Sequence, residues 1–168
     1  MKDAGYDIPA VSKITGISDR TLRFWIDVFL LEPELVRIRA SGREGRRKLF
    51  SVANVMQALL LQAMSYPEFS IEHKRQIIGL IDRLRLPDRD ILSASYLERN
   101  AHFIGIQRLQ EPSPDSVLGD LQYTVRDIGR MTLKRNHGAP VTAEDFKSGE
   151  PIMLISMNVM YEQIKDGL

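Results

Sequence analysis

The amino-acid sequence predicts a mostly α-helical fold: a winged helix-turn-helix with a two-stranded β wing, followed by an α-helical C-terminal region. Three observations predict it. They are two short amphipathic helices around a glycine at residues 8–31, a basic hairpin at residues 35–50, and two further amphipathic helices at residues 52–84. A chain of 168 residues is long enough for one or two domains. We expect residues 1–86 to form the first and residues 87–168 the second.

The first helix pair is predicted by apolar periodicity and by residues that favour helix ends. Ile8, Val11 and Ile14 recur at helical spacing. Gly16 then suits a helix exit, and Ser18 is a favourable N-cap for a second helix. That second helix has an apolar stripe at i, i+3, i+4 and i+7, which consists of Leu22, Trp25, Ile26 and Phe29.

The opposite face of the second helix carries Arg20, Arg23, Phe24 and Asp27. A short helix, a turn with a glycine and a second helix with two outward arginines are typical of a helix-turn-helix. A helical hairpin with a solvated charged face has the same pattern. These residues alone therefore leave both interpretations open.

Residues 35–50 predict a β-hairpin. Residues 35–39 alternate between apolar and basic side chains, as in a strand with one buried face. Residues 40–45 form a turn cluster with two glycines, and residues 46–50 are expected to return as the second strand. A flexible surface loop is the alternative, which the alternation in the first strand disfavours.

Basic charge is concentrated in this hairpin. The whole chain has a net charge of only +1, whereas residues 37–48 contain six basic residues against Glu44 alone. The rest of the chain is therefore net acidic, and the hairpin is a basic patch suited to phosphate contacts. The basic residues are Arg37, Arg39, Arg43, Arg46, Arg47 and Lys48.

Two longer helices follow the hairpin. Ser51 is a favourable N-cap, and apolar residues over 52–63 recur with the clearest helical period in the chain. Ser70 is the corresponding N-cap for a helix over residues 71–84.

The second half of the chain is expected to be helical. Residues 90–110 and 115–136 each predict a helix, and the latter has 3-4 apolar spacing over about two heptads. Residues 115–136 are therefore the candidate for a dimerisation helix, although a core-facing stripe is the ordinary interpretation. Residues 151–165 fit either a helix or a strand, because their apolar residues show no clear period.

The sequence contains no catalytic or metal-binding constellation. Cysteine is absent, which excludes disulfides and thiolate metal sites. His73, His102 and His137 lie far apart, and residues 42–48 lack the spacing of a phosphate-binding loop. We expect no enzyme activity, no cofactor and no bound metal. The absence of an apolar leader or membrane-length segment predicts a soluble, cytoplasmic protein with no membrane partner.

The order of the predicted elements resembles that of a known protein family. The first 85 or so residues resemble the N-terminal DNA-binding domain of MerR-family transcription regulators. The resemblance is carried by IPAVSKITGISDRTLRFW at residues 8–25, LL at 30–31, KLFS at 48–51 and FSIEHKRQII at 69–78. It implies a helix-turn-helix, a two-stranded wing and a second helix pair, in that order.

The resemblance also implies which residues contact DNA. Arg20, Thr21, Arg23 and Phe24 match family positions on or beside the recognition helix, and Lys48 matches a basic wing position that reaches phosphate. Adding the helix N-cap and the arginines of the hairpin gives the expected DNA-binding set: Ser18, Arg20, Thr21, Arg23, Phe24, Arg37, Arg39, Arg43, Arg46, Arg47 and Lys48.

The sequence departs from the family pattern in two places at the recognition helix and in the wing. Ile26 stands where the family usually has Glu, and Phe29 stands where it usually has Gly. The latter departure suggests a longer or differently bent helix exit. The wing is longer and richer in arginine than usual.

The expected function is sequence-specific binding of double-stranded DNA by a homodimeric transcription regulator, with a small molecule or another protein as effector. One alternative is an architectural or phage DNA-binding protein, such as an excisionase or a small terminase-like subunit. Another is a protein- or ligand-interaction module with weak DNA binding, using an apolar pocket around Phe146, Met153, Met157 and Met160.

Overall fold

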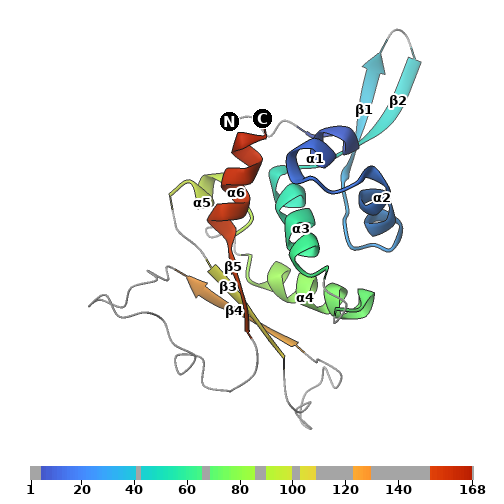
Figure 1. Cartoon of the computed structure of the whole chain (residues 1–168). Coiled ribbons are helices and arrows are strands. Elements are labelled where there is room, and N and C mark those ends of the chain that lie inside the picture. The colour runs from blue at the N-terminus through green and yellow to red at the C-terminus, as the bar shows by residue number, and fades with distance from the viewer. Residues whose placement is uncertain are drawn as a thin grey trace. The chain divides into compact units, whose positions relative to one another are not determined.

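The computed structural model describes residues 5–40, 43–65, 69–85, 90–99, 103–108, 123–129 and 152–167 (Figure 1). The chain groups into two compact units. The first comprises Met1–Phe69, Leu92–Ala94 and Val159–Leu168, and the second comprises Ser70–Ile91 and Ser95–Asn158. The expected domain boundary after residue 86 stays a prediction.

The first unit opens with the predicted helix-turn-helix. Helix α1 (Ile8–Thr15) starts at Asp7, whose carboxylate accepts a hydrogen bond from the Ala10 amide at 3.0 Å. It ends at Gly16, which has a φ of 72°. Helix α2 (Asp19–Asp27) follows after Ser18. The predicted helix pair and both its end signals are therefore confirmed, and its core residues are Val11, Ile14, Ile17, Leu22 and Trp25.

The exit of α2 differs from the prediction, because Phe29 does not continue the apolar stripe. Phe29 has a φ of 57°, and its side chain is 75% exposed. The Phe29 amide donates to the Ile26 carbonyl and the Leu30 amide to the Trp25 carbonyl, which is the bonding pattern of a Schellman motif. The chain thus leaves the helix in the ordinary way, with phenylalanine at the left-handed position that usually holds glycine.

The two-stranded wing is also confirmed. Strands β1 (Glu34–Ala40) and β2 (Arg43–Leu49) pair in antiparallel register, with Arg39 opposite Glu44 and Ala40 opposite Arg43. The predicted turn over residues 40–45 was too long, because cross-strand pairing extends the ladder through residues whose composition favours turns. The strands therefore continue to within two residues of each other along the chain.

Helix α3 (Val52–Ala63) forms the centre of the first unit. A reciprocal capping box joins Ser51 and Asn54 at its start. The Gln57 amide donates to the Leu30 carbonyl at 3.0 Å, so α3 holds the segment between α2 and the wing. Its predicted apolar face is confirmed, with buried Val52, Val55, Met56, Leu59 and Leu60.

Helix α6 (Met157–Asp166) contributes its residues from Val159 onward to the same unit. Tyr161 and Ile164 are fully buried. A Cβ atom on Gly167 would lie 3.1 Å from the Cα of Ile14 in α1, so the two backbones approach closely here and a larger residue would need a small shift of one of them. The end of the described chain therefore completes the core around the helix-turn-helix.

The second unit contains the other long helix and a three-stranded sheet. Helix α4 (Ile71–Arg83) has the predicted N-cap, Ser70, whose hydroxyl accepts from the His73 amide, and it lies against strand β4. The sheet has the order β4-β3-β5 and is antiparallel throughout. Its strands are β3 (Phe103–Arg108), β4 (Tyr123–Gly129) and β5 (Ile152–Ser156), and helix α5 (Ala94–Leu97) precedes them.

This sheet corrects the prediction of an α-helical C-terminal region. The expected helices over residues 90–110 and 115–136 are wrong where β3 and β4 lie. Val125 and Ile128 fit a helical stripe by spacing, but β-branched residues also favour strands, and pairing with β3 decides between the two. Residues 151–165, which fit either a helix or a strand by sequence, contain one of each, since β5 is followed directly by α6. The mostly helical class is confirmed, because helices contain more of the described residues than strands do.

Candidate nucleic-acid interface

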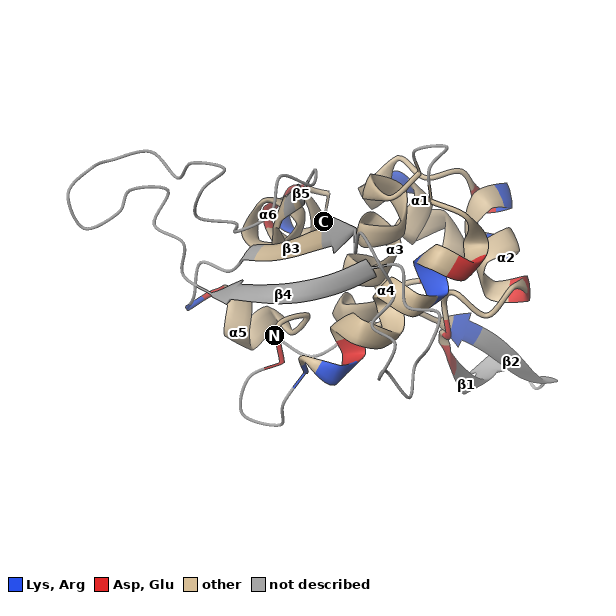
Figure 2. Cartoon of the chain, turned by 90° about the horizontal axis from the view of Figure 1, so that it is seen from below, with Lys and Arg blue, Asp and Glu red and all other residues tan. Residues whose placement is uncertain are grey.

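The outward face of α2 is held in place by its buried side. Leu22 and Trp25 lie in the core of the first unit, while Arg20 and Arg23 are exposed and Phe24 is 46% exposed. Charged residues of both signs lie along this helix (Figure 2). The backbone orientation of the two arginines is therefore fixed by packing on the opposite side.

Neither the Arg20 nor the Arg23 side chain makes a hydrogen bond or ion pair with another residue in the described part of the chain. Each guanidinium keeps its five N–H donors for an external acceptor. Arginine can donate two parallel hydrogen bonds to a guanine edge or to a phosphate. The arrangement therefore suits recognition of a polyanion with base edges in reach.

The N-terminal end of α2 is stabilised by two hydroxyl groups. Ser18 Oγ accepts a hydrogen bond from the Thr21 amide at 3.1 Å, and Ser18 Oγ and Thr21 Oγ1 lie 2.8 Å apart. The amides at a helix N-terminus also favour a nearby negative charge. Ser18 and Thr21, both predicted to contact DNA, thus lie at the start of α2, where Ser18 also serves as the N-cap.

The wing places its basic residues at defined positions in the ladder. Arg37 lies opposite Arg46, and Lys48, which is exposed, lies opposite Leu35. Alternation along the strands puts positions 37, 39, 46 and 48 on one face of the ladder and positions 43 and 47 on the other. The side chains of residues 35–47 lie outside the described part of the structure.

Residues 6–79 match the family of MerR HTH regulatory proteins. These residues are a MerR-type helix-turn-helix domain. Comparison with curated proteins finds no match for the chain. The MerR-type domain includes α1, α2, the wing, α3 and most of α4, and its family consists of DNA-binding transcription regulators. The residues predicted to contact DNA all lie within it.

Two polar residues of α3 hold the segment that follows α2 in the MerR-type domain, and the sequence alone did not single them out. Gln57 binds the Leu30 carbonyl, and Asn54 Nδ2 lies 3.5 Å from the Glu32 carbonyl. Both contacts join α3 to the segment that follows α2. The available signal was a polar residue within the most apolar helix of the chain, but its partner is 22 or more residues away in sequence.

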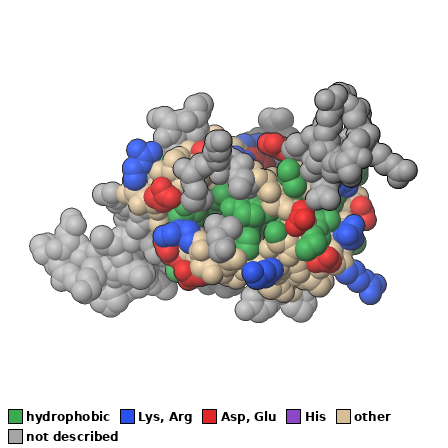
Figure 3. Space-filling view, turned by 90° about the horizontal axis from the view of Figure 1, so that it is seen from above, with side chains coloured by type: hydrophobic (Ala, Val, Ile, Leu, Met, Phe, Trp, Pro, Cys, Tyr) green, Lys and Arg blue, Asp and Glu red, His purple; other side chains and the backbone are tan. Residues whose placement is uncertain are grey.

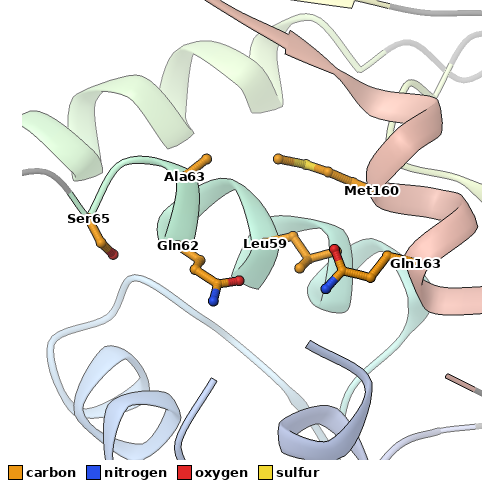
Figure 4. Close-up of a pocket in the computed structure, with 6 residues that line it drawn as sticks. All are labelled: Leu59, Gln62, Ala63, Ser65, Met160 and Gln163. Carbon is orange, nitrogen blue, oxygen red and sulfur yellow. The ribbon is translucent and has the colours of Figure 1, made fainter. Parts of the chain in front are cut away.

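A pocket of about 390 Å³ lies in the first unit, between the end of α3 and α6. The Met160 side chain reaches from α6 toward Ala63 (Figure 4). Of the four residues predicted to form a pocket, Met160 lines this one, whereas Met153 and Met157 do not and Phe146 lies outside the described residues. The lining is uncharged and consists of Leu59, Gln62, Ala63, Ser65, Met160 and Gln163.

The described residues contain no group of three or more His, Cys, Asp or Glu side chains that is able to hold a metal ion. His73 lies on α4, and His102 and His137 lie outside the described residues. No helix in the described part of the chain is both long and apolar enough to cross a bilayer. The expectation of an unknown effector stays a prediction.

Proposed function

We propose that this protein is a sequence-specific, homodimeric transcription regulator that places α2 in the major groove of DNA. The observation that carries the proposal is an anchored helix whose two outward arginines, Arg20 and Arg23, have no partner within the described structure. An α-helix fits the major groove, where a bidentate arginine contributes about 1–3 kcal/mol of discrimination between bases.

The wing supplies the second part of the proposal. Support comes from the six basic residues between positions 37 and 48, which belong to strands β1 and β2 (Figure 1). These strands follow α2 in the sequence and belong to the same unit. Phosphate contacts of this kind fix the position of a protein on DNA and carry no base information. We assign the wing residues to phosphate and the α2 residues to base edges.

The homodimer is inferred from the size of the recognition surface. One short helix reads only a few base pairs, and two-fold related helices reading half-sites one helical turn apart are the common solution. The helix expected to mediate dimerisation is replaced by strand β4 at residues 123–129. The proposed dimer interface is therefore left without an assigned element.

The test is fluorescence anisotropy with duplexes tiled across the DNA upstream of the gene, over a series of salt concentrations. We expect one duplex to bind more tightly than the others and the affinity to fall steeply with salt. Arg20→Ala or Arg23→Ala should weaken specific binding by about 5- to 100-fold. Lys48→Ala should weaken all duplexes and reduce the salt slope by about 1.

The matched control is Arg83→Ala, which removes an exposed arginine from the end of α4. It should leave binding unchanged. Equal binding of all duplexes, with unchanged affinity in the α2 variants, would contradict sequence-specific regulation and favour the architectural alternative. Sedimentation of the protein alone and with the preferred duplex tests the dimer separately.

A further inference from the structure

Phe29 is an outlier that the folded state of the first unit does not explain. Its side chain is 75% exposed, the largest exposed fraction among the large hydrophobic residues in the described structure. Its φ of 57° lies in the left-handed region, where a bulky side chain is unfavourable. Glycine would relieve the backbone, and burial gains nothing from the ring. Such strain at an exposed position points to a function outside the fold.

The backbone presents this ring rigidly. The neighbouring Leu30 and Leu31 are buried, and both their amides donate to the Trp25 carbonyl, at 2.8 and 3.2 Å. The Leu30 carbonyl in turn accepts from Gln57 on α3. The ring therefore stands on a segment that is fixed on both sides, so binding it costs little conformational entropy.

The charged residues nearest to Phe29 in the sequence are all acidic. Asp27, Glu32 and Glu34 are all exposed, and no basic residue occurs between Arg23 and Arg37. None of the three carboxylates has a partner within the described part of the chain. Apolar side chains also reach the surface between charged ones on the face shown in Figure 3. An acidic surround repels phosphate, so this part of the surface does not suit DNA.

We propose that Phe29 and its three carboxylates, together the acidic knob, dock another protein that offers an apolar pocket rimmed by lysine or arginine. A rigid exposed aromatic residue is the typical anchor of a protein interface, and the surrounding carboxylates supply charge complementarity to a basic rim. Phe29 itself follows the C-terminal end of α2, whereas Asp27 lies on the same face of α2 as Arg23 and Glu34 is the first residue of β1. The proposal goes beyond DNA binding, since it assigns a protein partner to the opposite end of the recognition helix.

The first experiment replaces Phe29 with the photo-crosslinking analogue p-benzoyl-L-phenylalanine in the full chain, expressed in its native host. Irradiation should yield one covalent adduct with a different protein, which mass spectrometry identifies. The same analogue at Phe24, on the DNA-facing side of α2, is the matched control and should not yield that adduct. An adduct at position 29 with DNA, with a second copy of this chain, or with nothing overturns the proposal.

The second experiment measures the Kd between the purified partner and the full chain. Phe29→Gly and Phe29→Ala should both raise the Kd by about tenfold or more, because both remove the ring. The triple variant Asp27→Asn, Glu32→Gln, Glu34→Gln should also raise it and flatten its salt dependence. An unchanged Kd in the Phe29 variants overturns the proposal even if an adduct forms.

The DNA affinities of Phe29→Gly and Arg20→Ala distinguish failure of this proposal from failure of the proposed function. Phe29→Gly keeps every residue assigned to DNA, so its affinity for the preferred duplex should equal that of the unsubstituted chain. Loss of DNA affinity in this variant would assign Phe29 to the DNA-binding surface and would overturn the proposed protein-docking role of the acidic knob. If Arg20→Ala does not change DNA binding, the proposed function is contradicted, but the proposed protein-docking role of the acidic knob is not.

Discussion

The two helices of the helix-turn-helix end in the same backbone conformation with opposite choices of residue. Helix α1 ends at Gly16, with a φ of 72°, and α2 is followed by Phe29, with a φ of 57°. Glycine adopts this conformation without steric cost, whereas an L side chain costs about 1–2 kcal/mol. The exit of α1 is therefore determined by the backbone preference of glycine. The second exit, that of α2, must be held by its packing and hydrogen bonds.

Among the variants that test the two helix exits, Trp25→Ala should lower the free energy of unfolding most, because Trp25 anchors the exit of α2. Its ring is buried and its carbonyl accepts from Leu30 and Leu31. Replacing a buried tryptophan with alanine costs about 3–5 kcal/mol in the free energy of unfolding. Urea denaturation measures it. Phe24→Ala, at the adjacent half-exposed position, should cost much less; equal losses would mean that Trp25 does not carry the second exit.

Gly16→Ala should have the next largest effect, a destabilisation of about 1–2 kcal/mol. A Cβ at this position meets nothing within 4 Å, so the loss comes from backbone strain and not from a clash. Gly79→Ala is the matched control. It also has open space around the new Cβ but lies inside α4, where alanine should stabilise by about 0.5–1 kcal/mol. Thermal unfolding that moves in the same direction for both variants would contradict the conformational explanation.

Phe29→Gly should have the smallest effect and the opposite sign. Relief of the left-handed strain outweighs the added chain entropy of glycine, and we expect a gain of up to about 1 kcal/mol in unfolding free energy. Phe29→Ala keeps the strain and should give no such gain. A loss of stability in Phe29→Gly would show that the exposed ring contributes to folding after all.

The sequence predicted those elements that local rules define. Ser18, Ser51 and Ser70 each cap the helix that they were expected to cap, and the alternation in residues 35–39 predicted the first wing strand. The outward position of Arg20 and Arg23 follows from the same helical period that buries Leu22 and Trp25. These features depend on neighbours a few residues away, which a single sequence contains.

Features that depend on distant partners were not predictable in this way. Strand β4 has a spacing that also fits a helix, and only pairing with β3 selects the strand. The period that placed Phe29 on the apolar stripe assumed that α2 continues, whereas the chain turns after Asp27 to bury Leu30 and Leu31. The contact of Gly167 with α1 has no local signal at all.

The position of α6 has a consequence for the order in which the protein matures. Tyr161 and Ile164 fill the core around the helix-turn-helix, yet they are synthesised long after it. Domains usually begin to fold during translation, from the N-terminus onward. The first unit therefore has its full core only after residue 167 has been synthesised. A transcript cut short in the second half therefore yields a chain that has all the residues predicted to contact DNA but lacks part of the core of the first unit.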